Sequence, residues 1–208
     1  MLNEVVVVLD FETTGLSPDR GDRITEVAAI RLEGDRIVDR YESLANCGVR
    51  IPPDITALTG ITQRMVDRAP PVKQVVRDLL RFVGHIPVVA HNASFDQRFF
   101  CSECEHAGEL NNADSFICSM RLSRRVYPSF QSHALGPLAR RLGITYRGSA
   151  HRAGADAEVT ANVIITIARD LQARHGPLAI NTRLLRELMT MPIAAASQRL
   201  ARITRERA

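Results

Sequence analysis

VVVVLDFETTGL, residues 5–16, carries the strongest fold signal in this chain. Its first five residues are apolar without interruption, which is typical of a central strand that is buried on both faces. Asp10 and Glu12 follow in what should still be extended chain, so their side chains point to the same side. Two like charges placed side by side repel each other, and the sequence must contain something that compensates them.

The composition is that of a globular protein with one main domain. Of the 208 residues, 45% are hydrophobic and 24% are charged, which suits one domain with a sizeable core and a short appendage. We expect a domain over residues 1–176 and a helical C-terminal extension over residues 177–208. The apolar run at residues 5–9 is too short for a signal peptide or a membrane-spanning helix. Four dispersed cysteines indicate a reducing compartment. We therefore expect a cytoplasmic protein without a membrane partner.

The extension carries the net charge of the chain. The whole chain has a formal charge of +4. The extension has two glutamates and six arginines, which give the same +4 and leave residues 1–176 neutral; the arginines are Arg183, Arg186, Arg199, Arg202, Arg205 and Arg207. A basic tail favours a polyanion such as nucleic acid, although a solvated helix face has the same composition. Two amphipathic helical pieces separated at Pro192 are expected, with an apolar face that docks on the body or on a partner.

The order of the expected elements predicts an α/β fold. Residues 24–32 and 37–44 have the pattern of strands, and Gly34 and Asp35 between them suit a hairpin turn. Helices and strands then alternate: a short helix ended by Gly60, a helix over residues 71–83, a strand over 87–91, a helix over 94–107, a strand over 115–118, and helices near 121–127, 133–142 and 155–175. A meander followed by this alternation predicts a mixed sheet of about five strands with helices on both faces.

Two of these helices begin with a capping signal. Asp54 can cap the short helix that Gly60 ends. Ser94 and Gln97 have the spacing of a capping box at the start of the helix over residues 94–107.

Four acidic residues lie where strands end or helices begin. Asp10 and Glu12 follow the first strand, Asp96 follows the strand over residues 87–91, and Asp156 opens the last helix of the domain. Singly, each suits a helix N-terminus or the end of a strand. Together they are a hard oxygen ligand set for Mg²⁺ or Mn²⁺, and two such ions promote water attack on a phosphodiester. His151, in a Gly- and Ala-rich segment five residues before Asp156, has a side chain suited to accept the proton from that water.

The cysteines offer a second, weaker metal hypothesis. Cys101, Cys104, His106 and Cys118 could bind zinc, but Cys104 and His106 are closer in sequence than structural zinc ligands normally are. The alternative is that Cys101 and Cys104 lie three residues apart on one helix as small core residues.

Three segments resemble the motifs of a known family. "VVLDFETTGL", "AHNASFDQRFF" and "HRAGADAE" are similar, in order and spacing, to the three motifs of the DEDDh, or DnaQ-like, 3′-to-5′ exonucleases, which include the proofreading epsilon subunit of bacterial DNA polymerase III. "LTGITQRMV" also resembles a recurring segment of that family, and the resemblance covers about residues 4–175. It implies an RNase H-like fold with strand order 3-2-1-4-5.

The resemblance also implies roles for individual residues. It implies that two Mg²⁺ or Mn²⁺ ions are bound by Asp10, Glu12, Asp96 and Asp156, and that His151 is the general base. It implies that the terminal nucleotide is held by the backbone around Thr13 and Thr14 and by the side chain of Leu16, in a pocket that Asn92 and Phe95 support. Leu16 as a wedge against a base is chemically reasonable, because base faces stack on apolar surfaces, whereas a leucine that caps the core is the alternative. The other five histidines have no matching role.

The leading hypothesis is therefore a metal-dependent exonuclease that releases nucleotides from single-stranded 3′ ends. "ETTG" resembles the DNA-directed branch of the family, so DNA is favoured over RNA. A proofreading role beside a DNA polymerase subunit, with the extension as tether, is the main cellular interpretation. The alternatives are a free-standing exonuclease for repair or RNA processing, and a catalytically silent scaffold that binds nucleic acid.

Overall fold

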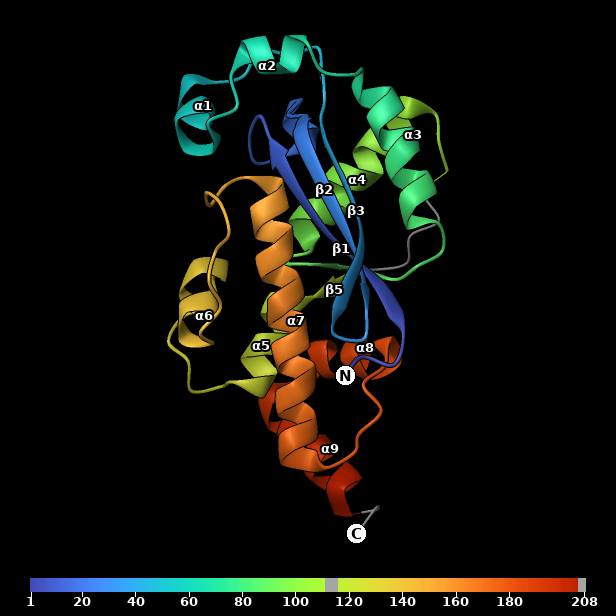
Figure 1. Ribbon diagram of the computed structural model, residues 1–208, viewed down its shortest axis with the longest axis vertical. Coiled ribbons are helices and arrows are strands. Elements are labelled where there is room, and N and C mark those ends of the chain that lie inside the picture. Colours follow the sequence, from blue (N-terminus) through green and yellow to red (C-terminus); the bar gives the residue numbers. More distant parts are fainter. Residues whose placement is uncertain (111–115, 206–208) are drawn as a thin grey trace.

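The apolar run at the start of the chain forms the central strand of the sheet. A computed structural model describes residues 1–110 and 116–205. β1 (Val5–Thr13) lies in the middle of a five-stranded sheet with the order β3-β2-β1-β4-β5, which confirms the predicted α/β fold (Figure 1). β2 (Ile24–Glu33) and β3 (Arg36–Leu44) form the expected antiparallel meander. β4 (Val88–Ala90) and β5 (Ile117–Cys118) add in parallel. Ser115, the predicted start of the last strand, lies outside the described residues.

Both faces of β1 are buried, as its continuous apolar pattern predicts. Residues 6–9 have no exposed surface, and neighbouring residues of a strand point to opposite faces. The strand continues through both acidic residues to Thr13, with a register shift between Glu12 and Thr13. Asp10 and Glu12 are therefore held by the ladder itself rather than by the loop that follows.

Ten helical segments complete the described part of the chain. They are η1 (Pro18–Arg20), α1 (Pro53–Thr59), α2 (Gln63–Asp67), α3 (Val72–Val83), α4 (Ser94–Ala107), α5 (Ser119–Val126), α6 (Leu135–Arg141), α7 (Ala153–His175), α8 (Thr182–Thr190) and α9 (Ile193–Arg205). α7 packs along β1 and β2, α3 contacts β2 and β3, and α4 contacts β1. The helices match the sequence pattern except for η1 and α2, which were not expected.

Both capping predictions are wrong. Pro52 is the N-cap residue of α1, and Asp54 lies within the first turn, although Gly60 ends the helix in a left-handed conformation as expected. Ala93 precedes α4, whose first residue is Ser94 and which has no side-chain cap. The Gln97 side chain instead accepts a hydrogen bond of 3.3 Å from the backbone N–H of Phe116, because the chain returns beside α4 at that point.

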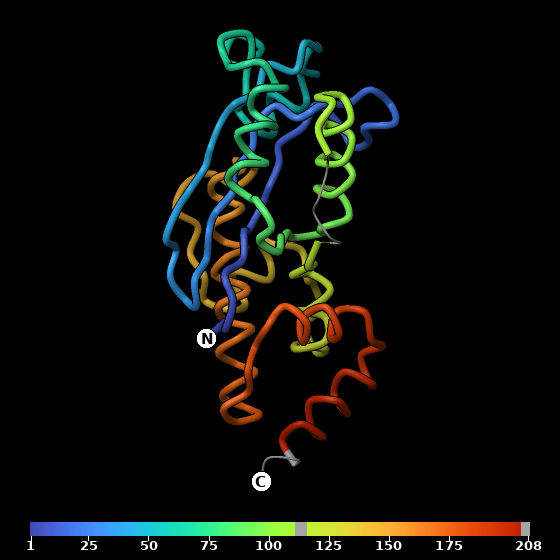
Figure 2. Tube along the Cα trace, turned by 90° about the vertical axis from the view of Figure 1, so that its right-hand side faces the viewer, coloured from blue at the N-terminus to red at the C-terminus, as the bar shows by residue number. Residues whose placement is uncertain are grey.

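The C-terminal extension packs on the body of the protein. It forms two helical pieces that meet at Pro192, as predicted, and after α7 the chain turns back so that α8 contacts α5 and β5 (Figure 2). Its buried residues belong to the main hydrophobic cluster and include Leu184, Leu185, Leu188, Met189, Ala196, Leu200 and Ile203. The backbone N–H of Cys118 on the edge strand lies 3.3 Å from the Met189 sulfur. The apolar face of the extension was expected to dock on the body or on a partner, and it packs on the body.

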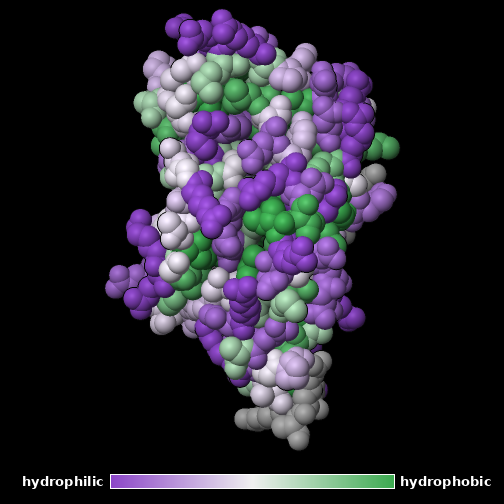
Figure 3. Space-filling model, viewed as in Figure 1, coloured by the Kyte–Doolittle hydropathy of each residue, from purple (hydrophilic) through white to green (hydrophobic). Residues whose placement is uncertain are grey.

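The surface of the molecule, unlike this core, is mainly hydrophilic on the face that Figure 3 shows. Hydrophilic residues cover most of the face seen in Figure 1, with smaller apolar patches between them (Figure 3). Among residues 1–110 and 116–205, no helix combines the length and apolar character needed to cross a membrane.

Candidate active site

A cleft of about 220 Å³ opens where β1 ends. Its lining includes all five residues of the predicted catalytic set, which are Asp10, Glu12, Asp96, His151 and Asp156. Of the predicted nucleotide pocket, Thr13, Leu16 and Phe95 line the cleft, whereas Thr14 and Asn92 do not. Residues more than 140 positions apart in the sequence are thus brought together at one edge of the sheet.

Each acidic side chain is positioned by regular secondary structure. Asp10 and Glu12 lie on β1, and Asp96 and Asp156 lie in the first turns of α4 and α7. Asp96 is 2% exposed, and its Oδ1 accepts a hydrogen bond of 3.3 Å from the backbone N–H of Phe11, which ties α4 to β1. The first turn of a helix favours a negative charge, which partly offsets the cost of burying a carboxylate there.

Burial raises the pKa values of all four carboxylates, and the charge of a neighbouring carboxylate adds to the shift for Asp10, Glu12 and Asp96. Burial raises the pKa of Glu12 to about 8, helped by the charges of Asp156 and Glu26, while Arg152 opposes the shift. Burial also raises the pKa of Asp96 to about 8, against backbone hydrogen bonds that lower it. The pKa of Asp10 lies well above its usual range because of burial and the charges of Asp96 and Asp156. The pKa of Asp156 is raised by burial, opposed by the neighbouring Tyr146 hydroxyl.

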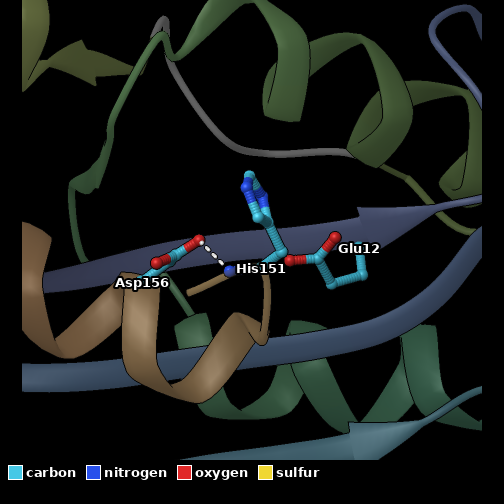
Figure 4. A group of neighbouring side chains, drawn as sticks. All are labelled: Glu12, His151 and Asp156. Atoms are coloured by element: carbon cyan, nitrogen blue, oxygen red, sulfur yellow. Dashed lines mark hydrogen bonds between the residues drawn. The ribbon is translucent and has the colours of Figure 1, made fainter. Parts of the chain in front are cut away.

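The chemistry of these donors fits divalent metal ions. Glu12, His151 and Asp156 offer ligand atoms within 4.8 Å of one another, and His151 lies between the two carboxylates (Figure 4). Oδ2 of Asp156 accepts a 3.2 Å hydrogen bond from the backbone N–H of His151, but Oδ1 is buried without a hydrogen-bond partner among the described residues. A buried carboxylate oxygen left in this state is costly unless a cation or another donor meets it. Hard oxygen donors are the ligands that Mg²⁺ and Mn²⁺ prefer.

The cleft contains a second histidine that the sequence did not single out. His91 follows β4, and its Nε2–H donates a hydrogen bond of 3.0 Å to the carbonyl oxygen of His133. Its Nδ1 lies 2.8 Å from the Ser119 hydroxyl. Burial lowers the pKa of His91 to about 4. Both ring nitrogens are occupied, so His91 is a neutral structural group, and His151 is left as the cleft histidine with a free ring.

Leu16 lies exposed at the opening of the cleft, on a loop that hydrogen bonds hold in place. Its side chain is 78% exposed, so the alternative that it caps the core is wrong. The Asp22 carboxylate accepts hydrogen bonds from the Ser17 backbone N–H at 3.0 Å and the Thr14 hydroxyl at 3.4 Å. A Cβ atom at Gly15 would lie 2.4 Å from Asp22 Oδ1, so any other residue there would displace the Asp22 carboxylate from these hydrogen bonds. These contacts hold an apolar side chain in water, where a ligand can reach it.

The cleft also has an apolar wall that sequence reasoning missed. Ile55, Leu58 and Thr59 of α1 line it, and Leu58 is 52% exposed. These residues lie within or beside the "LTGITQRMV" segment, so that resemblance was the signal that could have found them. Together with Leu16 and Phe95 they give the cleft one apolar side and one acidic side.

The zinc hypothesis is not supported. Cys101 and Cys104 lie on α4 as the alternative predicted, and all four cysteines are free thiols. Among the described residues, Glu12, His151 and Asp156 form the one group with metal-ligand spacing, and it contains no cysteine.

Comparisons with known proteins agree with this geometry. A family model described as an exonuclease, RNase_T, matches residues 7–164. The DNA polymerase III of PolC type from Bacillus subtilis is 38% identical over 168 residues, which are 80% of this chain and 12% of that protein. The 3′-5′ exonuclease DinG of Bacillus subtilis is 34% identical over 171 residues, which are 82% of this chain and 18% of DinG. The chain thus spans less than a fifth of the length of these relatives.

Solved structures share the fold. Exonuclease X in complex with 5′ overhanging duplex DNA matches with a TM-score of 0.68 at 26% identity, covering 88% of this chain and 99% of the other. The nuclease domain of 3′hExo, a DEDDh family member bound to rAMP, matches with a TM-score of 0.71. Its identity is 20%, over 80% of this chain and 92% of the other, so it supports the fold alone.

Proposed function

Because this chain belongs to the DnaQ-like superfamily of 3′-to-5′ exonucleases, we propose that it hydrolyses the terminal phosphodiester at single-stranded 3′ ends, with DNA preferred over RNA. The observation that carries the proposal is the convergence of four carboxylates and His151 on one cleft from three separate parts of the chain. The proposed exonuclease domain is residues 1–176 and the proposed extension is residues 177–208, whose buried side chains between Leu178 and Ile203 add to the hydrophobic core.

The family implies divalent metal ions, and two ions, Mg²⁺ or Mn²⁺, are proposed here. Asp10, Glu12, Asp96 and Asp156 would hold them, and bound metal would supply activation of water and stabilisation of the leaving oxygen. His151 accepts the proton of the attacking water on a ring nitrogen, since its imidazole faces solvent and makes no hydrogen bond with the described residues. Burial of the carboxylates keeps water from screening their charges, which strengthens their hold on a cation.

The apolar side of the cleft is proposed to hold the terminal nucleotide. Leu16 and Phe95 offer apolar surface to a base, and stacking of this kind tolerates any sequence. The backbone around Thr13 approaches the sugar and the phosphate. Thr14 and Asn92 lie outside the cleft lining, so their proposed part is to support the turn that presents Leu16 and the start of α4.

Two cellular settings follow from the relatives. The PolC-type polymerase favours a proofreading role for this domain, whether within a longer chain or beside a polymerase subunit in the cytoplasm. The exonuclease DinG favours the alternative of a nuclease that acts without a polymerase. The apolar face of the extension is buried on the body, so a polymerase tether would have to use its polar surface.

The test is removal of the proposed base. His151→Ala should lower exonuclease activity by about 100-fold or more, which is the usual worth of a general base, while the circular dichroism and melting temperature stay close to those of the wild type. His106→Ala is the matched control, because His106 is an exposed histidine on α4 outside the cleft. The assay compares 3′- and 5′-labelled DNA and RNA oligonucleotides of the same sequence, with Mg²⁺ or with EDTA. A folded His151→Ala protein with full activity would overturn the assignment.

A further inference from the structure

We propose that Glu26 is a positioning residue that fixes His151 relative to Glu12, acting through Arg152 and the first N–H group of α7. The inference rests on the proposed function, because it assigns the proton-accepting role to His151. Neither the family motifs nor the sequence pattern singled out Glu26, which lies on β2 and is 8% exposed.

Glu26 is the direct cross-strand neighbour of Glu12. The two residues are paired in the antiparallel register of β1 and β2, which places their carboxylates on the same face of the sheet. Like charges directly opposite each other are destabilising, and burial makes the repulsion stronger. Such a pair persists only if a cation and hydrogen-bond donors compensate it.

Arg152 and Ala153 provide this compensation. The Arg152 guanidinium donates from Nε to both carboxylate oxygens of Glu26 at 3.1 and 3.2 Å, and from Nη2 to Oε1 at 2.5 Å. The backbone N–H of Ala153 donates to Oε2 at 2.9 Å. Ala153 is the first residue of α7, whose N-cap, Arg152, has no side-chain capping bond of its own. The carboxylate of a neighbouring strand therefore caps this helix, where a negative charge is favourable.

The cap acts on His151 through the backbone that carries the imidazole. His151 directly precedes Arg152, and its backbone has the left-handed φ of 61°, a conformation that costs free energy for a residue other than glycine. Its ring has no hydrogen-bond partner among the described residues, and its backbone N–H reaches Asp156 at 3.2 Å. The ring position is therefore set by the backbone, and Glu26 anchors that backbone immediately after His151.

The start of α7 also packs closely against β3. A Cβ atom at Gly154 would lie 2.9 Å from the Glu42 carboxylate on β3, so α7 begins in close contact with the meander. Glu26 thus links β2, the strand paired with Glu12 of β1, to α7, the helix that carries Asp156.

The experiment compares Glu26→Gln, Glu26→Ala, Arg152→Lys and Arg152→Ala in the full chain. Glu26→Gln keeps an oxygen for the Ala153 N–H but loses the ion pair, and we expect kcat to fall about 10-fold. Glu26→Ala loses both contacts, and we expect kcat to fall about 100-fold, which is the cost of misplacing a reacting group by about 1 Å. KM should change by less than about 3-fold, because substrate contacts are intact. Arg152→Lys keeps the charge without the fork geometry and should restore only part of the kcat that Arg152→Ala loses.

Hydrogen exchange supplies a readout that does not depend on activity. The Ala153 amide should exchange faster in Glu26→Ala than in Glu26→Gln and in the wild type, because its acceptor has been removed. The matched control is the Arg169–Asp35 ion pair at 2.8 Å, which also links α7 to the β2–β3 hairpin but lies four turns further along the helix. Asp35→Asn should leave both kcat and exchange at Ala153 unchanged.

The outcomes separate the two proposals. A folded Glu26→Ala protein with the wild-type kcat and exchange rate would overturn the positioning role, even if His151→Ala is inactive. A wild-type protein without exonuclease activity would overturn the proposed function, whereas faster exchange at Ala153 would still show that Glu26 holds the loop. If Glu26→Ala does not fold, Glu26→Gln and Arg152→Lys carry the test, and wild-type kcat in both of them would overturn the positioning role.

Discussion

The acidic side chains of the cleft are held in a costly state when no cation is bound. Glu12 and Asp96 both have a pKa of about 8, and that of Asp10 is also raised. The backbone does not relax this repulsion, because the residues are fixed in β1 and in the first turn of α4. The fold therefore stores an unfavourable electrostatic term at the place where the proposed metal ions would bind.

This repulsion predicts an unusual pH dependence of stability. In EDTA, the free energy of unfolding should fall as pH rises from about 5 to about 8, because the unfolded chain releases the proton of Glu12 near its ordinary pKa of 4.5, whereas the folded protein keeps it until about 8. The stabilisation is complete below the unfolded pKa and is lost as pH passes the folded pKa. Urea unfolding at several pH values measures the slope, which Glu12→Gln should reduce. A wild-type protein without metal whose stability rises over this range would contradict the raised pKa values.

The proposed role of Leu16 in substrate binding can be tested separately from stability. Because the side chain is 78% exposed, Leu16→Ala should leave the free energy of unfolding within about 0.5 kcal/mol of the wild type. KM for a single-stranded oligonucleotide should rise about 10-fold, because loss of one stacking contact costs about 1–3 kcal/mol. Leu110→Ala is the control, since Leu110 is 85% exposed and does not line the cleft. Equal KM values for both variants would remove Leu16 from the substrate site.

At the scale of elements, the sequence predicted what depends on local pattern. The buried run of β1, the Gly34–Asp35 turn and the helix stop at Gly60 follow from periodicity and backbone preference, and the structure confirms them. The capping box at Ser94 failed because a distant segment supplies a different partner for Gln97. The roles of Glu26 and His91 could not be predicted from the sequence. Glu26 contacts Arg152 and His91 contacts Ser119, and both contacts depend on sheet register and tertiary packing.

The extension should behave as part of the core. Leu188 on α8 has no exposed surface, so Leu188→Ala should lower the free energy of unfolding by about 2–5 kcal/mol. Ile193→Ala, at a site that is 44% exposed on α9, should cost less than about 1 kcal/mol. Both variants should keep the wild-type kcat at a temperature where they are folded. A stable Leu188→Ala protein would indicate that the extension contributes little to the fold.

At the scale of the whole molecule, the cleft and the extension lie far apart. α7 has 23 residues and is therefore about 35 Å long. The cleft residues His151 and Asp156 are at its N-terminal end, whereas α9 contacts α7 and reaches its last residue, since Thr204 of α9 lies 3.0 Å from the His175 ring (Figure 1). The basic residues of the extension are thus remote from the terminal phosphodiester, and electrostatic attraction of a longer polyanion is the contribution that they can make.

Metal binding at the cleft should stabilise the entire fold. Mg²⁺ at a hundredfold excess over its Kd adds about 2.7 kcal/mol to the free energy of unfolding, which raises the melting temperature of a domain of this size by roughly 5–10 °C. Asp10→Asn should melt higher than the wild type in EDTA but gain much less from Mg²⁺. Scanning calorimetry with Mg²⁺, Mn²⁺ and EDTA measures both effects. Equal melting temperatures with and without metal in the wild type would contradict a metal site at the cleft.

The topology of the sheet also determines when the cleft is completed during folding. β1, β2 and β3 pair as sequence neighbours, whereas β4 joins β1 only after the segment that contains α1, α2 and α3. Contacts between neighbours in sequence form faster than contacts that must close a long loop. Glu12 and Glu26 face each other across the early meander, but Asp96 and Asp156 arrive with the later, non-local pairings. On refolding, nuclease activity should therefore return with the slowest long-range step rather than with the first formation of secondary structure.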